Sequence, residues 1–159
     1  MTSLGDARVG LGFDVHPRAT DRPLWLGGVR FEGDDGLAGH SDGDVVCHAI
    51  ADALLGAVAL GDLGEHFPET DPDLQGISGI SLLQRVVALV RERGFAATSS
   101  DVTVICERPV IGPRRGEMRV TLADVLGVPG DRMSVKATRP EGLGLTGDGV
   151  GCLAIATIE

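Results

Sequence analysis

The chain has 159 residues, 43% of them hydrophobic, and its 14 basic and 23 acidic side chains give a formal net charge of −9. This length is sufficient for one domain with a substantial core, so we expect a single domain over residues 1–159. The acidic balance, one Trp and no Tyr exclude the basic surface and stacking platforms of a nucleic-acid-binding protein.

The cysteines and the N-terminus indicate where the protein works. Cys47, Cys106 and Cys152 are widely spaced and form no C-x-x-C pair, so we expect neither a disulfide framework nor a zinc ribbon. The first ten residues lack the apolar core of a signal peptide, and the longest apolar run, residues 53–60, is too short to span a bilayer. We therefore expect a cytoplasmic protein with no membrane partner.

The N-terminal third begins with a predicted strand and a predicted hairpin. Residues 8–13 form the strand, and Asp14 and His16 follow it, two residues apart and so on one face. Apolar residues 24–26 and 29–31 flank a Gly-Gly pair, which predicts a hairpin with a two-residue turn.

The stretch GHSDGDVVCHAIADALLG, residues 39–56, predicts a helix that the rest of the chain surrounds. Ser41 or Asp42 is its expected N-cap. Asp44, His48 and Asp52 recur every four residues on one side, a pattern that is usually a solvated face. The opposite side is an apolar stripe made of Val45, Val46, Ala49, Ile50, Ala53 and Leu54.

The remaining two thirds alternate between helical and extended patterns. Residues 60–71 have no period and many turn residues, which is typical of a functional or mobile loop. The predicted helices and strands are helices 81–93 and 113–126 and strands 100–106, 133–138 and 150–158. This order predicts an α+β fold in which a mixed β-sheet has helices packed on one face.

The segment GLGLTG, residues 142–147, matches the G-x-G-x-x-G pattern of dinucleotide-binding proteins. That fingerprint requires a helix directly after it, whereas residues 150–158 predict a strand. The sequence therefore gives no support to a nucleotide-binding Rossmann fold.

Asp14, His16 and His48 are candidate metal ligands. A carboxylate and two imidazoles leave one position open on a tetrahedral zinc ion, which is typical of a catalytic site. The alternative is that His48 faces solvent and Asp14 only caps a turn.

Seven short motifs then occur in order between residues 8 and 158. They are GFDVH (12–16), HSDGD (40–44) with His48, DALLG (52–56), GDLG (61–64), FPETD (67–71), DVTV (101–104) and VKATRPEGLGLTG (135–147). Together they resemble the 2-C-methyl-D-erythritol 2,4-cyclodiphosphate synthase family. The resemblance implies a homotrimer with active sites between adjacent subunits, acting in the non-mevalonate isoprenoid pathway.

The resemblance also implies a reaction. The substrate would be 4-diphosphocytidyl-2-C-methyl-D-erythritol 2-phosphate, and the products would be the 2,4-cyclodiphosphate and CMP. Its 2-phosphate is the nucleophile, so the protein has to neutralise and align two anionic groups rather than supply a nucleophilic side chain. By the same resemblance, Asp14, His16 and His48 hold Zn2+, and Glu141 helps to hold a second divalent cation, Mg2+ or Mn2+.

The family pattern assigns further roles by position. His40 and Ser41 would contact the phosphates, residues 62–64 and 67–71 the methylerythritol, and residues 106–112 and 137–138 of a neighbouring subunit the cytidine. The residues implied to bind the substrate are Asp14, His16, His40, Ser41, Asp62, Leu63, Gly64, Phe67, Pro68, Glu69, Thr70, Asp71, Cys106, Pro109, Ala137, Thr138, Glu141 and Leu145.

His40 and Arg139 are the candidate catalytic residues. Arg139 stands where the family commonly has a hydroxyl, and its guanidinium would neutralise developing charge on a phosphate; the alternative is a solvent-exposed arginine. The other departures from the family pattern are Glu69, Val110, Pro140, Asp148 and Val150.

Two other functions fit the same residues. A metal-dependent phosphohydrolase would use a zinc-bound water on the same three ligands. A trimeric, zinc-stabilised binding protein would need no turnover at all.

Overall fold

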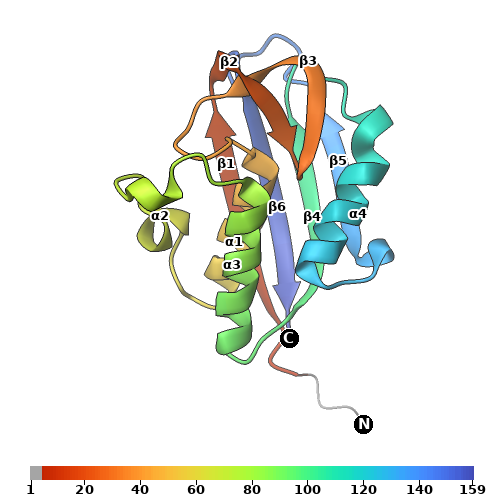
Figure 1. Ribbon diagram of the computed structural model, residues 1–159. Coiled ribbons are helices and arrows are strands. Elements are labelled where there is room, and N and C mark those ends of the chain that lie inside the picture. The colour runs from red at the N-terminus through yellow and green to blue at the C-terminus, as the bar shows by residue number, and fades with distance from the viewer. Residues whose placement is uncertain (1–4) are drawn as a thin grey trace.

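The computed structural model describes residues 5–159 and contains a four-stranded mixed sheet with three helices on one face (Figure 1). The sheet order is β1-β6-β4-β5, and β2 and β3 form a separate two-stranded sheet. The elements are β1 (Arg8–His16), β2 (Arg18–Leu26), β3 (Val29–Leu37), α1 (Val45–Ala57), α2 (Leu63–His66), η1 (Pro72–Leu74), α3 (Gly79–Glu92), β4 (Ala97–Ile105), η2 (Gly112–Arg114), α4 (Arg115–Leu126), η3 (Gly130–Arg132), β5 (Met133–Thr138) and β6 (Val150–Ile158).

The pairing of the strands confirms the expected mixed sheet. β6 runs antiparallel to both β1 and β4, whereas β4 and β5 are parallel, with Ser100 opposite Met133 and Ile105 opposite Thr138. The parallel pair places the carboxyl ends of β4 and β5 at the same edge of the sheet. β5 and β6 have the predicted bounds, and β6 directly after residues 142–147 confirms that the glycine-rich segment opens no helix.

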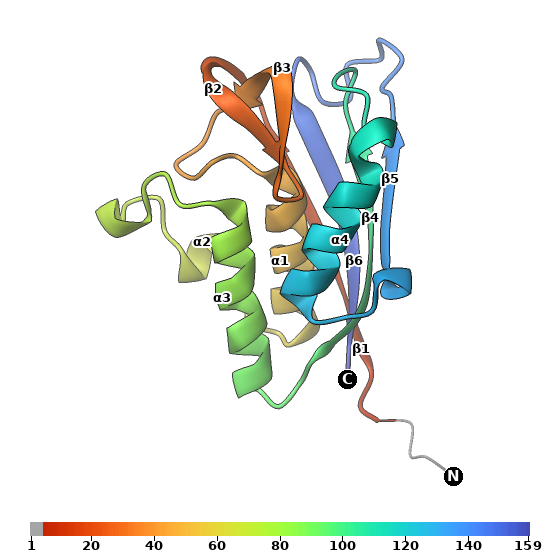
Figure 2. The same ribbon diagram turned by 45° about the vertical axis from the view of Figure 1, so that its right-hand side comes forward.

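Helix α1 lies in the centre of the molecule, between the sheet and α3 (Figure 2). Two glycines of β1 allow the strand to approach it closely. A Cβ at Gly10 would overlap the backbone carbonyl of Ala53, and a Cβ at Gly12 would overlap that of Ala49. The backbone of β1 therefore rests directly on the backbone of α1, with no side chain between them at these two points.

The N-cap of α1 differs from the prediction. Asp44 is the cap and is fully buried, so it does not belong to a solvated face, and neither Ser41 nor Asp42 has this role. Its carboxylate accepts hydrogen bonds from the amides of Gly27 and Gly28 at 2.8 Å, and from the first turn of α1. The predicted two-residue hairpin turn is confirmed, and it buries Asp44 because its N–H groups point at the start of the helix.

Three other predictions needed correction. The loop 60–71 contains the short helix α2, which Asp62 caps through its side chain at the Glu65 amide. Helix α3 begins at Gly79, two residues earlier than predicted, because Ser78 caps it. The start of the last predicted helix is a 3-10 turn, η2, because Pro113 lies in its first turn.

The sheet face without helices carries exposed apolar side chains. Alternate residues of β1 and two of β6 point away from the helices, because side chains alternate across a strand. They are Val9, Leu11, Phe13, Val15, Leu153 and Ile155, and each residue is 40–66% exposed. Such a contiguous apolar face is typical of a surface that another protein covers.

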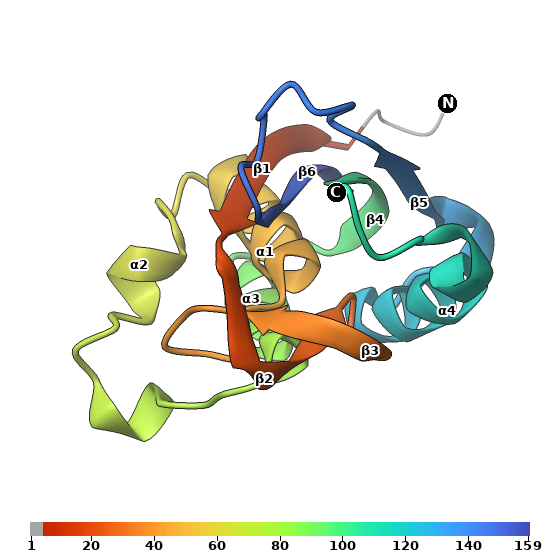
Figure 3. The same ribbon diagram turned by 90° about the horizontal axis from the view of Figure 1, so that it is seen from above.

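The β2–β3 hairpin lies across the end of the molecule where β1 finishes and α1 begins (Figure 3). Its pairing is interrupted by register shifts between Ala19 and Leu24, so that residues 20–22 form an irregular, bulged stretch. Within residues 5–159, no helix is both long and apolar enough to cross a membrane.

Candidate active site

Asp14, His16 and His48 come together where β1 ends beside α1. Asp14 Oδ2 lies 3.0 Å from His16 Nε2 and 3.1 Å from His48 Nδ1. One ligand atom from each residue falls within 4.8 Å of the others. The prediction that a strand end and a helix face bring these three side chains together is confirmed, so they could hold a metal ion. The solvent-facing alternative for His48 is wrong because His48 is only 7% exposed.

Charge in this cluster follows from its hydrogen bonds. Burial alone would raise the pKa of Asp14, but hydrogen bonds and charge from His16 and His48 outweigh it and hold the pKa well below its usual range. The hydrogen bond to Asp14 raises the pKa of His16, although burial opposes this. Asp14 is therefore a carboxylate at neutral pH and is ready to bind a cation.

His48 has a second partner on its other ring nitrogen. Its Nε2 lies 3.2 Å from Ser41 Oγ, which accepts a hydrogen bond from the Gly43 amide. Nδ1–H donates to Asp14; with a metal on Nδ1 instead, the ring would carry its proton on Nε2 and donate to Ser41. In that tautomer Ser41 Oγ would accept two hydrogen bonds, and its own O–H would be free to donate to an anion.

His40 precedes Ser41 in the turn formed by residues 39–41. Its Nε2 donates to the backbone carbonyl of Asp71 at 3.1 Å, and its own carbonyl accepts from the Gly76 amide at 2.8 Å. These contacts join the turn to residues 71–77 and leave His40 Nδ1 without a partner among the hydrogen bonds of residues 5–159. The side chain is thereby placed at the entrance to the pocket.

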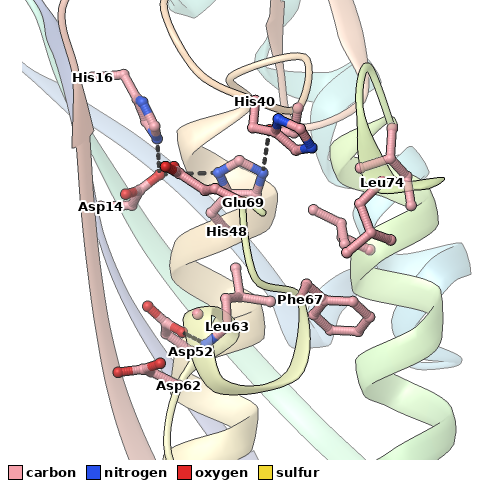
Figure 4. A pocket seen from close by; sticks show the side chains of 14 residues that line it. Asp14, His16, His40, His48, Asp52, Asp62, Leu63, Phe67, Glu69 and Leu74 are labelled. Atoms are coloured by element: carbon pink, nitrogen blue, oxygen red, sulfur yellow. Dashed lines mark hydrogen bonds and ion pairs between the residues drawn. The ribbon is translucent and has the colours of Figure 1, made fainter. Parts of the chain in front are cut away.

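A cavity of about 350 Å3 lies below the cluster (Figure 4). Most of the residues predicted to bind the phosphate and methylerythritol parts of a substrate line this cavity. Its lining is Asp14, His16, His40, Ser41, His48, Asp52, Asp62, Leu63, Gly64, Phe67, Glu69, Leu74, Ile77 and Leu82. Pro68, Thr70 and Asp71 belong to the same loop but do not line the cavity.

Asp52 lines the cavity although the sequence analysis gave it no role in the site. It lies one turn after His48 on α1, and its Oδ1 accepts the Leu63 amide at 2.8 Å, so it attaches the start of α2 to the helix that carries His48. Burial raises its pKa, and the nearby Asp62 and Asp14 carboxylates add to this. The four-residue spacing between His48 and Asp52 is the sequence feature that could have predicted this role. No comparable feature marks the apolar lining residues Leu74, Ile77 and Leu82, because apolar side chains occur throughout the sequence.

The other predicted residues lie apart from this cavity, around the carboxyl ends of β4 and β5. Cys106 is buried, and burial raises the pKa of its thiol to about 11. The backbone of Cys106 continues the parallel pairing by donating to the carbonyl of Thr138. Five members of this group are exposed: Ala137, Thr138, Arg139, Glu141 and Leu145. Pro109, in the loop after β4, is half-buried. Glu141 is not part of the three-residue cluster, and Arg139 does not line the cavity.

Comparison with known proteins adds to this geometry. A model of the YgbB family matches residues 7–159. The 2-C-methyl-D-erythritol 2,4-cyclodiphosphate synthase of Trichlorobacter lovleyi is 50% identical over 151 residues, which cover 95% of this chain and 96% of that protein. The bifunctional enzyme IspD/IspF of Erythrobacter litoralis is 49% identical over 156 residues, so the chain spans 40% of the length of that relative.

Solved structures agree with the sequence relatives. A 2C-methyl-D-erythritol-2,4-cyclodiphosphate synthase in a CDP-bound form has a TM-score of 0.88 and 34% identity, over 96% of this chain and all of that one. The resemblance inferred from the seven motifs is thereby confirmed. The chain belongs to the YgbB family.

Proposed function

We propose that this chain cyclises 4-diphosphocytidyl-2-C-methyl-D-erythritol 2-phosphate to 2-C-methyl-D-erythritol 2,4-cyclodiphosphate and releases CMP, as a lyase of the non-mevalonate isoprenoid pathway. The observation that carries the proposal is the cluster of Asp14, His16 and His48 at the mouth of the cavity. Relatives of that name match nearly the whole chain, which supports the same activity.

The donor set fits Zn2+ as the resident metal. One carboxylate and two imidazoles with a hydrogen-bonded outer partner are typical of catalytic zinc sites, which keep one position open. When bound, the ion supplies positive charge that polarises a phosphate oxygen. Glu141 is the proposed ligand of a second divalent cation, Mg2+ or Mn2+, because carboxylate oxygens suit these hard ions.

The protein side chains around the cluster would bind and align the anionic groups. The free O–H of Ser41 would donate to a phosphate oxygen, and His40 would donate from the adjacent position once Nδ1 is protonated. Since the 2-phosphate is itself the nucleophile, the reaction needs no nucleophilic side chain. The buried thiols of Cys47, Cys106 and Cys152 agree with this requirement.

The far end of the cavity would hold the methylerythritol. Asp62, Leu63 and Gly64 at the start of α2, together with Phe67 and Glu69, combine carboxylates with apolar surface. Carboxylates accept hydrogen bonds from sugar-alcohol hydroxyls, and the apolar groups suit the methyl carbon. Pro68, Thr70 and Asp71 would keep this loop in place.

The nucleotide part of the site would come from another copy of the chain. We propose a homotrimer in which Cys106, Pro109, Ala137, Thr138 and Leu145 frame the cytidine bound beside a neighbouring metal cluster. Two observations support it: these residues lie outside the cavity of their own chain, and the free face of β1 and β6 is apolar. The CDP-bound relative supports a cytidine ligand. A cytoplasmic location suits the three unpaired cysteines and belongs to the same proposal.

Product analysis would test the function. The chain is incubated with the nucleotide substrate, Zn2+ and Mg2+, and the products are separated by anion-exchange chromatography and assigned by 31P NMR. The proposal expects CMP and a cyclic diphosphate in equal amounts. An acyclic phosphate would indicate the zinc-dependent phosphohydrolase, and binding without turnover would indicate the zinc-stabilised binding protein.

A further inference from the structure

The turn that carries His40 and Ser41 is held by a residue from a distant strand. We propose that Arg22 of β2 is a positioning residue that fixes this turn, so that His40 and Ser41 meet an anionic group of the substrate in one orientation. The inference rests on the proposed function, because that function gives the turn its phosphate-binding role.

Three successive carbonyls of the turn are occupied by donors. Arg22 Nη1 donates to the carbonyl of Gly39 at 2.7 Å, and Nη2 donates to that of Ser41. The carbonyl between them, that of His40, accepts from the Gly76 amide at 2.8 Å. One guanidinium therefore fixes the two peptide groups on either side of His40. It also engages two carbonyl dipoles, whose negative ends would repel a phosphate.

The bulge in β2 explains how Arg22 reaches the turn. Arg22 lies in the unpaired stretch between Ala19 and Pro23, and bulges commonly redirect a side chain beside an active site. The opposite strand has Gly36 here, and a Cβ at that position would clash with the carbonyls of Arg22 and Pro23. Gly36 thus allows the bulge to come close enough for Arg22 to bridge to residues 39–41.

The charge of Arg22 is not neutralised by a nearby carboxylate. Among the ion pairs formed within residues 5–159, none involves Arg22. The cavity beyond the turn is lined by carboxylates, those of Asp14, Asp52, Asp62 and Glu69. A guanidinium that binds two carbonyls keeps its full positive charge, and these carbonyls flank His40, which lines the cavity.

A change in the turn would reach the metal cluster through Ser41. Ser41 Oγ accepts a hydrogen bond from the Gly43 amide and lies 3.2 Å from His48 Nε2. When a metal on Nδ1 places the ring proton on Nε2, His48 donates to Ser41 and leaves the O–H of Ser41 to the substrate. If residues 39–41 rotate, the direction of this O–H changes while Asp14, His16 and His48 stay in place. Loss of Arg22 should therefore impair substrate alignment more than zinc binding.

Two variants and a matched control test the inference. Arg22→Ala removes the guanidinium, and Arg22→Lys keeps the charge but replaces the planar fork, whose two terminal nitrogens each bind one carbonyl, with a single ammonium nitrogen. The control is Arg85→Ala, which removes an exposed arginine of α3 that makes no side-chain hydrogen bond or ion pair with residues 5–159. Each protein is assayed for kcat, KM, zinc content and Tm.

We expect kcat/KM to fall about tenfold in Arg22→Ala and somewhat less in Arg22→Lys, with zinc content and Tm as in the wild type. Added guanidinium chloride, at concentrations that leave Tm unchanged, should restore part of the activity of Arg22→Ala and have no such effect on Arg85→Ala. A loss that guanidinium does not restore, or a kcat/KM within twofold of the wild type, would overturn the inference. A wild type that makes no cyclic product would instead refute the proposed function.

Discussion

The metal cluster and the edge formed by β4 and β5 are two parts of the proposed site with opposite properties. Asp14, His16 and His48 come from two elements of one chain, are mostly covered, and bond to each other directly. Thr138, Arg139 and Glu141 are exposed, and no hydrogen bond between their side chains holds them together within residues 5–159. The candidate metal ligands are thus already assembled within one chain, whereas the role proposed for the edge requires a second surface to complete it. Metal binding and turnover should therefore be separable.

The largest effect is expected at the preassembled part. His48→Ala removes one of three ligands, and turnover should fall by more than about a hundredfold, because loss of an outer partner alone costs 10–100-fold. Zinc content, measured by mass spectrometry of the purified protein, should fall with it. The apolar stripe of α1 is unchanged, so circular dichroism should still show the folded helix. Full zinc content with normal turnover would refute the ligand set.

Mixing two inactive variants tests whether the edge belongs to a neighbouring site. In the proposed trimer, His48→Ala would inactivate the metal half of each subunit and Glu141→Ala the edge half, so each variant alone should be inactive. If subunits mix randomly at equal amounts, about one quarter of the sites combine two intact halves. The expected turnover after joint refolding is therefore about a quarter of the wild-type value. No recovery would place both halves in one subunit.

A smaller effect is expected at Arg139. The family resemblance implies a hydroxyl at this position, and Arg139→Thr should lower kcat/KM about tenfold if the guanidinium neutralises charge on the phosphate. Arg132→Thr, at an exposed arginine of η3, is the control. Equal values for the two variants would remove Arg139 from the site.

The smallest effect concerns stability at Asp52. Burial raises its pKa above the ordinary 3.8, so the folded chain binds this proton more tightly than the unfolded chain. The stability that protonated Asp52 gives to the fold is fully present below the pKa of Asp52 in the unfolded chain. It is lost as pH rises through the pKa of Asp52 in the folded chain. Asp52→Asn keeps an acceptor for Leu63 and cannot ionise. Its Tm should exceed the wild-type value by a few degrees at about pH 7, and the difference should disappear towards about pH 4. A constant difference would assign the effect to packing.

The same contrast explains what the sequence could predict. Alternation in β1 placed Asp14 and His16 on one face and the helical period placed His48 on one side of α1, because both patterns are local. That the strand end and the helix face meet was a hypothesis, which the structure confirms. Asp44 was placed wrongly since its burial depends on the Gly27-Gly28 turn, which is distant in the sequence. Asp52 and Arg22 were missed for a similar reason: the amide and carbonyls that they bind belong to backbone, whose position no residue pattern encodes. Roles at the β4–β5 edge came only from family resemblance.

The close contact of Gly10 and Gly12 with α1 also sets the size of the three-residue cluster. Asp14 and His16 move with the strand and His48 with the helix, so the separation of the two backbones fixes how far apart their candidate ligand atoms lie. A methyl group at position 12 would force the strand outward and spread these atoms without altering any of the three side chains. Two glycines outside the cluster thereby hold its side chains at their spacing.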